Sequence, residues 1–192
     1  NMNNDVLEEL LPVEKPLVQP YLERFDKVID RGINQLNWKS GGINEFIDES
    51  MEVIRNVDEI LKTMKQNLSH VADKLAQWQK PLMSRKSRPV VKDEFEREHK
   101  NLIKERYSEI KEGGKQIQNF LKDTNRVLRV SNASNDWRAY VDFVNNVVVE
   151  GLAKVVQVSL DYLLNQIDFE TISRDDKLPM IEVRLELVGS EI

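Results

Sequence analysis

The sequence predicts a mainly α-helical protein: an elongated antiparallel bundle of four long helices, followed by a short C-terminal β segment. Charged residues make up 32% of the 192-residue chain and only seven glycines occur, a composition typical of long helices. Apolar residues recur at spacings of three and four along most of the chain, which indicates amphipathic helices. Stretches that contain glycine, proline or serine separate four such runs.

The first two predicted helices span residues 15–36 and 43–82. The first has one apolar stripe, and Pro16 and Pro20 fall in its opening turns, where proline is least costly. The second has the strongest periodicity in the chain, typical of a heptad seam. Forty helical residues would reach roughly 60 Å, so we expect a rod-like molecule. Its seam positions are Ile43, Ile47, Ser50, Ile54, Val57, Leu61, Met64, Leu68, Val71, Leu75, Trp78 and Leu82.

Residues 80–92 break this pattern with two prolines and two serines, which indicates an exposed loop between helices. The concentrated positive charge has two interpretations. The loop is either solvated and kept off other chains by its charge, or it is a candidate contact surface for an acidic partner or an anionic lipid surface. Trp38, in a glycine-bearing turn, is a further candidate contact with a partner, or it closes one end of the bundle. The basic residues of the loop are Lys80, Arg85, Lys86, Arg88 and Lys92.

The third predicted helix, residues 93–130, has a more polar seam and should pair with the second in antiparallel fashion. Gly113 and Gly114 lie inside it. Each glycine costs about 1 kcal/mol of helix stability relative to alanine. The pair therefore predicts either a kink or a close helix crossing.

The fourth predicted helix, residues 136–167, is much more apolar. Its stripe is wider than one seam, so it is either the central helix or a helix with one face that awaits another domain. After Pro179, apolar and polar residues alternate from 181 to 187, which indicates a strand that must pair with a second copy or with a sheet beyond this sequence. We therefore divide the chain into a helical bundle, residues 1–170, and a C-terminal strand, residues 171–192, that leads into a following domain.

The residues offer little for catalysis. The chain has no cysteine, which excludes disulfides and thiolate zinc sites, and it has only two histidines. Glu96 and His99 have a spacing found in di-iron bundles, but such a site needs a second pair and two further carboxylates. No phosphate-binding loop motif occurs. We predict no catalytic residue, no metal and no cofactor, and therefore no enzyme.

Charge and hydropathy narrow the class of partner. A net charge of -5 argues against a nucleic-acid surface. No apolar stretch of about 18 residues and no basic leader occurs, so neither a membrane span nor a secretory signal is expected. The predicted partners are proteins.

Four features spread over residues 17–192 resemble the tail, or stem, of dynein heavy chains, with the axonemal branch the more similar. They are packing motifs: Trp38 in its turn, Trp137 with Tyr140, the leucine-rich stretch 160–164, and the segment 179–187. The resemblance implies a fragment of a very long polypeptide whose ATPase ring and microtubule-binding stalk lie elsewhere.

The role that the resemblance implies is that of a non-catalytic, stiff helical arm between the motor part and the cargo- or doublet-docking end. Such an arm would present surfaces to dynein intermediate chains, light chains or another heavy chain during microtubule-based movement. It implies a cytoplasmic, cytoskeletal location in the axoneme of a cilium or flagellum. The oligomeric state of the segment stays open.

Two other classes fit the residues alone. An unrelated spectrin-like or tethering-complex rod would show the same heptads, but it has no reason to end in a strand. A bundle enzyme or metal carrier is the third class, and metal analysis of the purified protein would identify it.

Overall fold

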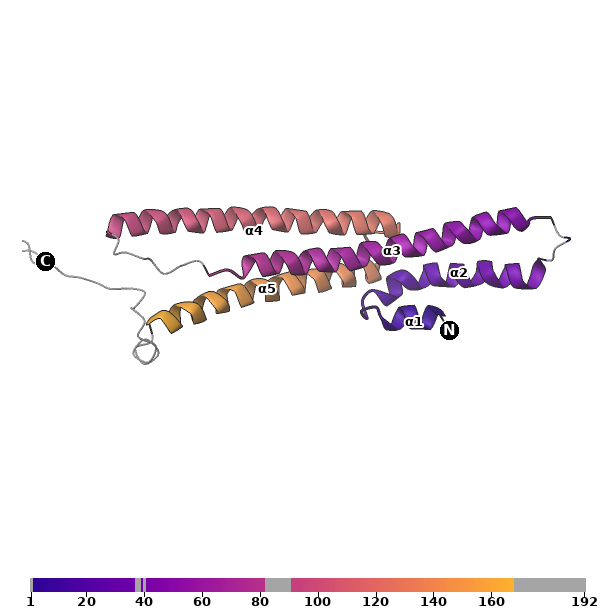
Figure 1. Ribbon diagram of the computed structural model, residues 1–192, viewed down its shortest axis with the longest axis horizontal. Coiled ribbons are helices and arrows are strands. Elements are labelled where there is room, and N and C mark those ends of the chain that lie inside the picture. The colour runs from indigo at the N-terminus through magenta and orange to yellow at the C-terminus, as the bar shows by residue number, and fades with distance from the viewer. Residues whose placement is uncertain (1, 37–38, 40, 82–90, 168–192) are drawn as a thin grey trace, which may run out of the picture. The chain divides into compact units, whose positions relative to one another are not determined.

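A computed structural model describes residues 2–36, 39, 41–81 and 91–167. Within these ranges the chain forms five helices and no strand (Figure 1), so the prediction of a mainly α-helical protein is confirmed. The predicted strand after Pro179 and the domain boundary near residue 170 lie outside the described residues, and both stay predictions. The helices are α1 (Met2–Glu8), α2 (Lys15–Gln35), α3 (Ile43–Trp78), α4 (Lys92–Leu128) and α5 (Asn135–Ile167).

The four long helices begin within one residue of the predicted positions. Pro16 lies in the first turn of α2, where a missing N–H leaves no helical hydrogen bond unmade. The turn before α5 is closed by the Ser134 N–H, which donates to the Ser131 carbonyl at 2.9 Å. The Ser134 carbonyl then accepts from the Arg138 N–H at 3.0 Å, which is the bond expected of a residue that precedes a helix. The short helix α1 was not predicted.

The chain divides into two compact units. The first combines Asn1–Asp73 with Gly114–Val148, and the second combines Lys74–Gly113 with Val149–Ile192. The helices α3, α4 and α5 each contribute residues to both units.

The first unit is held together by antiparallel helix pairs. Arg31 of α2 forms an ion pair with Glu49 of α3, and Gly32 leaves room for the ring of Phe46. The Tyr21 hydroxyl donates to the Leu128 carbonyl, which fixes α2 to the end of α4. The apolar core of this unit consists of Leu17, Val18, Leu22, Val28, Val53, Ile60, Met64, Val71, Ile117, Leu128, Trp137, Tyr140 and Val144.

Between Ser50 and Val71 the buried face of α3 differs from the predicted seam by a rotation of one residue, whereas Leu75 and Trp78 at the end of the helix are buried as predicted. One column of the heptad was predicted correctly, because Ser50, Met64 and Val71 are buried. The adjoining column is Val53, Ile60 and Asn67. The predicted alternatives Ile47 and Ile54 are 49% and 46% exposed, and Leu61 and Leu68 are half-buried. Since both flanks of the shared column carry apolar residues, the periodicity alone does not determine which flank the neighbouring helices cover.

A buried polar pair joins α3 to α4 in the first unit. The Asn67 side-chain amide donates to the Thr124 hydroxyl, which donates in turn to the Phe120 carbonyl at 2.8 Å. Asn67 is 8% exposed and Thr124 is fully buried. Because each hydroxyl or amide that loses water here gains a protein partner, the pair avoids most of the desolvation penalty.

The second unit contains a close helix crossing at the end of α3. The Trp78 side chain is 1% exposed, and its indole lies against Gly113 of α4. The Arg106 guanidinium donates to the carbonyls of Trp78 at 2.7 Å and Lys80 at 2.9 Å. A Cβ atom at Gly113 would overlap the six-membered ring of Trp78, whereas one at Gly114 would meet nothing within 4 Å. The sequence predicted either a kink or a close helix crossing at this glycine pair, and the contact of Gly113 with Trp78 agrees with the close crossing.

We expect opposite effects when each glycine of the pair is replaced by alanine. Gly113→Ala should lower the free energy of unfolding by about 1 kcal/mol, because overpacking against Trp78 outweighs the gain in helix propensity. Gly114→Ala should raise it by up to about 1 kcal/mol, because the same gain meets no obstacle. Urea unfolding followed by circular dichroism would measure both variants, each serving as the control for the other. Equal shifts would contradict the close crossing.

Candidate interaction surfaces

The predicted basic surface is described only in part. Trp38, Arg85, Lys86 and Arg88 lie outside the described residues, and their role stays a prediction. Lys80 follows the end of α3 and is exposed, and its backbone carbonyl accepts from Arg106. Lys92 is the first residue of α4 and is also exposed.

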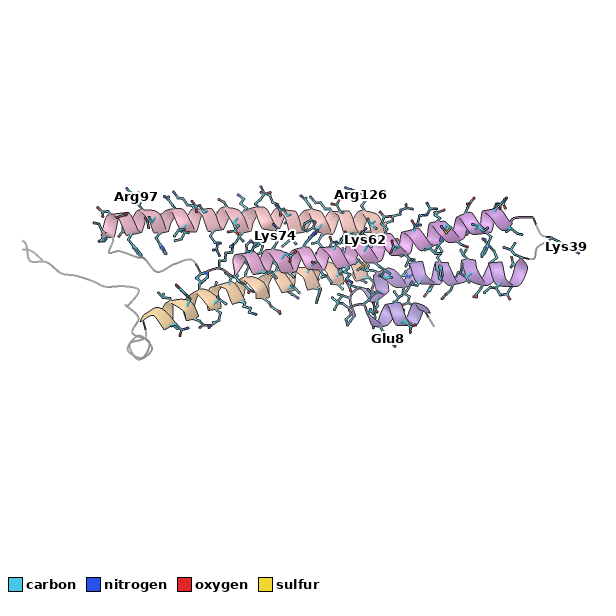
Figure 2. The ribbon with its side chains drawn as sticks, in the orientation of Figure 1. Glu8, Lys39, Lys62, Lys74, Arg97 and Arg126 are labelled. Atoms are coloured by element: carbon cyan, nitrogen blue, oxygen red, sulfur yellow. The ribbon has the colours of Figure 1, made fainter. Side chains whose placement is uncertain are left out.

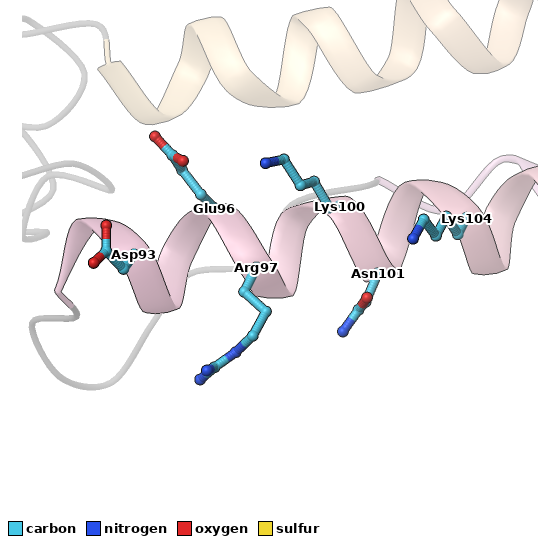
Figure 3. A pocket seen from close by; sticks show the side chains of 6 residues that line it. All are labelled: Asp93, Glu96, Arg97, Lys100, Asn101 and Lys104. Atoms are coloured by element: carbon cyan, nitrogen blue, oxygen red, sulfur yellow. The ribbon is translucent and has the colours of Figure 1, made fainter.

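A shallow depression runs along the first turns of α4, close in sequence to the predicted basic loop. It has a volume of about 330 Å³. Figure 3 shows Glu96 and Lys100 projecting from one side of the helix, and Arg97 and Asn101 from the opposite side. The six side chains do not converge on one point, so they do not form a binding site for a small ligand. They are Asp93, Glu96, Arg97, Lys100, Asn101 and Lys104.

The charge on the start of α4 is mixed. Residues 92–106 carry five basic and five acidic side chains, so this part of the helix has no net charge. The positive potential expected of the loop sequence therefore does not continue along α4, and a mixed helix face of this kind is usually solvated.

An exposed apolar surface described in the second unit lies on α5. Four large apolar side chains are at least half exposed there, and they follow one another in steps of seven, four and four residues. This spacing places them on one side of the helix. The sequence left two interpretations of this helix open, a central helix or a helix with one face that awaits another domain, and the exposed stripe agrees with the second. We call it the α5 stripe: Val149, Val156, Leu160 and Leu164, which are 64%, 59%, 50% and 58% exposed.

Neither histidine lies in a constellation suited to chemistry. The ring of His99 stacks on Phe95 with centroids 5.6 Å apart, and His70 lies against Phe120 at 4.5 Å. Among the described residues no group of three or more histidine, aspartate or glutamate side chains is placed to hold a metal ion. The Glu96 and His99 spacing therefore has no partner ligands within these ranges.

One carboxylate of the first unit is buried. Glu14, just before α2, is 4% exposed, and its Oε2 accepts from the Leu11 N–H at 2.9 Å. Burial raises the pKa of Glu14 above its ordinary value, and the Leu11 hydrogen bond lowers it by less. Tyr140 on α5 is fully buried, and its hydroxyl has no hydrogen-bond partner among the described residues. Burial, and secondarily the charge of Glu14, raises the pKa of Tyr140.

Glu14 should make the protein less stable as the pH rises. Because the folded state holds the Glu14 proton more tightly than the unfolded state does, this group contributes stability below the unfolded pKa near 4.5 and loses it as the pH rises through the folded pKa. Glu14→Gln keeps an acceptor for Leu11 and removes the charge. Its stability relative to the parent chain should therefore increase between pH 4 and pH 7. Urea unfolding at several pH values would test this, and a difference independent of pH would contradict it.

No helix within the described ranges is both long enough and apolar enough to cross a bilayer. 

The described part of the chain consists of long helices, with an exposed apolar stripe on α5. Comparison with known proteins identifies the class to which the chain belongs. The family model described as "Dynein heavy chain, N-terminal region 1" matches residues 1–46. Over 98% of its length the chain is 38% identical to the flagellar outer-arm dynein beta chain of Chlamydomonas reinhardtii.

Further relatives are named as ciliary or axonemal dyneins. The chain is 29% identical over 96% of its length to the ciliary dynein beta chain of Tripneustes gratilla, and 27% identical over its whole length to axonemal dynein heavy chain 9 of Homo sapiens. It spans about 4% of the length of these relatives. The chain belongs to the dynein heavy chain family and corresponds to part of its N-terminal tail. This part is not the ATPase motor, and it is non-catalytic.

Sequence reasoning missed the polar groups that organise the first unit. Glu14 stands between two short apolar stretches and gives no sign of burial, and Asn67 lies one residue from a predicted seam position. A signal existed for Thr124, because it lies four residues after Phe120 and three before Val127, in the apolar periodicity of the third predicted helix. Its partner could be found only once the register of α3 against α4 was known.

Proposed function

We propose that this segment is a stiff helical arm in the tail of an axonemal dynein heavy chain. It connects the motor part to the cargo- or doublet-docking end and presents helical faces to intermediate chains, light chains or another heavy chain. Its place of action is the axoneme of a cilium or flagellum. The residues after 170 lead into the following domain of the heavy chain.

The length of its helices supports the role of an arm. The helix α3 has 36 residues, α4 has 37 and α5 has 33, and each therefore extends roughly 50 to 55 Å at 1.5 Å per residue. The structure describes each of the three as one continuous helix, and long continuous helices curve only gently.

The observation that carries the proposal is the α5 stripe. Each of its four large apolar side chains is 50 to 64% exposed. A partner that buried the exposed part would therefore contribute about 1 to 2 kcal/mol per side chain. Exposed contiguous apolar surface of this kind usually marks a protein interface. An arm that is covered by other chains in an assembly would carry such a stripe, whereas an isolated rod would not need one.

The test places charges on the α5 stripe within the full-length heavy chain. Val156→Glu and Leu160→Glu would be expressed together in ciliated or flagellated cells that lack the endogenous heavy chain. We expect fewer intermediate, light or partner heavy chains to co-purify with the variant, and fewer dynein arms on isolated axonemes, because a buried unpaired carboxylate opposes association.

The double variant Lys154→Gln with Asn165→Glu is the matched control, since it changes the net charge by the same two units at exposed positions of α5 off the stripe. It should assemble as the parent does. Thermal melts of the purified 192-residue chains should show that all variants fold. If the stripe variant folds and assembles at parental levels, the stripe is not the docking face, and the proposal fails.

A further inference from the structure

Three helices of the first unit form a groove that the proposed function does not use. It lies where the first half of α2 and the middle of α3 meet the end of α4, and it has a volume of about 210 Å³. Its floor is apolar, with Ile60 2% exposed and Val127 half-buried. Its rim is polar and mostly exposed: Tyr21, Arg24, Asn56, Glu59, Arg126 and Arg129.

The rim carries three arginines and one glutamate, so its net charge is positive. Arg126 is labelled on α4 in Figure 2, and among the described residues its guanidinium pairs only with Asp123 of its own helix, at 3.1 Å. Both side chains of that pair are more than half exposed, and such a pair gives up little when another acid replaces it. Arg24 and Arg129 form no ion pair with an acid among the described residues.

A structural role explains two of the arginines but not the third. Arg126 and Arg129 lie at the end of α4, where cationic side chains complement the negative end of the helix dipole. Arg24 comes from the middle of α2, where no such reason applies. Its guanidinium is nevertheless part of the same rim.

The groove is held in shape by its own backbone and side chains. The Tyr21 hydroxyl donates to the Leu128 carbonyl and so joins the α2 wall to the α4 wall. Burial raises the pKa of Tyr21, and the nearby charge of Arg129 lowers it by less, so the phenol keeps its proton at neutral pH. Arg129 adopts a left-handed conformation with φ of 49°, which turns the chain sharply at the edge of the groove. A preformed site loses less conformational entropy when a ligand binds.

We propose that this groove binds an acidic segment of a protein partner. Carboxylates fit the guanidinium groups in paired hydrogen bonds, and an apolar side chain between them would cover Ile60 and Val127. Glu59 and the carbonyl end of α4 disfavour a compact, doubly charged phosphate, whereas a peptide distributes its charge along the groove. The inference does not rest on the α5 stripe, which belongs to the other compact unit, so the two experiments fail separately.

The test measures binding of a fluorescein-labelled peptide of six glutamates around a central leucine to the 192-residue chain by fluorescence anisotropy. Arg24→Gln and Arg129→Gln should each weaken binding by about tenfold, because each removes a charge-assisted hydrogen bond. Binding should weaken further as salt is added. Arg55→Gln, at an exposed position of α3 that does not line the groove, is the matched control and should bind as the parent does.

Other outcomes would overturn the inference. Equal weakening by Arg55→Gln would mean nonspecific attraction. Displacement of the peptide by millimolar inorganic phosphate would mean a simple anion site, and binding to vesicles of anionic lipid in preference to the peptide would mean a membrane surface. Absence of peptide binding at millimolar concentration would also overturn it. Thermal melts should show that Arg24→Gln folds. Arg24→Lys keeps the charge but not the paired geometry, so its affinity for the peptide should lie between that of the parent and that of Arg24→Gln.

Discussion

Replacing Trp78 by alanine is expected to lower the free energy of unfolding by about 3 to 5 kcal/mol, the loss typical of a large buried aromatic side chain. Trp78 is 1% exposed and fills the space against Gly113. Because Gly113 has no side chain, it offers nothing that could move into the cavity. Part of the loss should come from the Arg106 bonds to the carbonyls of Trp78, the last residue of α3, and of Lys80 just after it, because both bonds depend on the same crossing.

Chemical denaturation followed by circular dichroism would measure the effect of Trp78→Ala. Gln77→Ala, one residue earlier and exposed, is the control and should remain within about 0.5 kcal/mol of the parent. A second change tests the geometry, since Gly113→Leu should be harmful alone but should partly restore stability to Trp78→Ala by filling the cavity. A Trp78→Ala variant as stable as the parent would contradict the packing described for this crossing.

The Asn67 and Thr124 pair gives the second large expected effect. Thr124→Val should lower the free energy of unfolding by about 1 to 3 kcal/mol, because the Asn67 amide stays buried and loses its main acceptor. The remaining acceptor, the Phe120 carbonyl, lies at the limit of hydrogen-bond distance at 3.5 Å. Combining Thr124→Val with Asn67→Leu should recover most of the loss, since two apolar side chains can replace a bonded polar pair.

A double-mutant cycle by urea unfolding would measure the coupling between these two positions. Contacting residues of this kind usually couple by 0.5 to 3 kcal/mol. Strict additivity of the two single losses would indicate that the side chains do not form the bond. The same cycle would test the register of α3 against α4, because only this register brings the two residues together.

Helix positions were predictable because local signals determine them. Proline and glycine mark the ends of the helices. Apolar residues spaced three and four residues apart mark the bodies of α2, α3, α4 and α5. The helix α1 was missed because its seven residues, MNNDVLE, show no apolar stripe. Hydrogen bonds to the residues that follow hold α1 in place; for example, the Leu10 N–H donates to the Leu7 carbonyl at 3.3 Å.

Helix faces were less predictable than helix positions. On α3 the sequence offers apolar residues on both flanks of the seam, and the structure covers the flank with Val53 and Ile60 while leaving Ile47 and Ile54 about half exposed. The covered flank also includes the polar Asn67, which hydrophobic periodicity cannot select. Which flank is covered depends on the neighbouring helices, and this is tertiary information.

Some features of the candidate surfaces are visible in the sequence, whereas others depend on how the helices pair. The excess of apolar residues on α5 was predictable because it is visible in the sequence, but whether α5 would be a central helix or leave a face exposed was not. The arginine groove was not, because Arg24 and Arg126 are about a hundred residues apart and only the pairing of α2 with α4 brings them to one rim. The basic loop was visible as a cluster of charge, but whether a partner uses Arg85, Lys86 or Arg88 stays a prediction.

Trp78 and Trp137 are buried in different compact units, and this gives each unit its own fluorescent probe. With Trp38 changed to phenylalanine, a chain that keeps only Trp78 would follow the melting of one unit, and a chain that keeps only Trp137 would follow the other. Coincident transitions would mean that the continuous helices make the segment a single cooperative body. Separate transitions would mean that a mechanical load could melt one half of the segment while the other half stays folded.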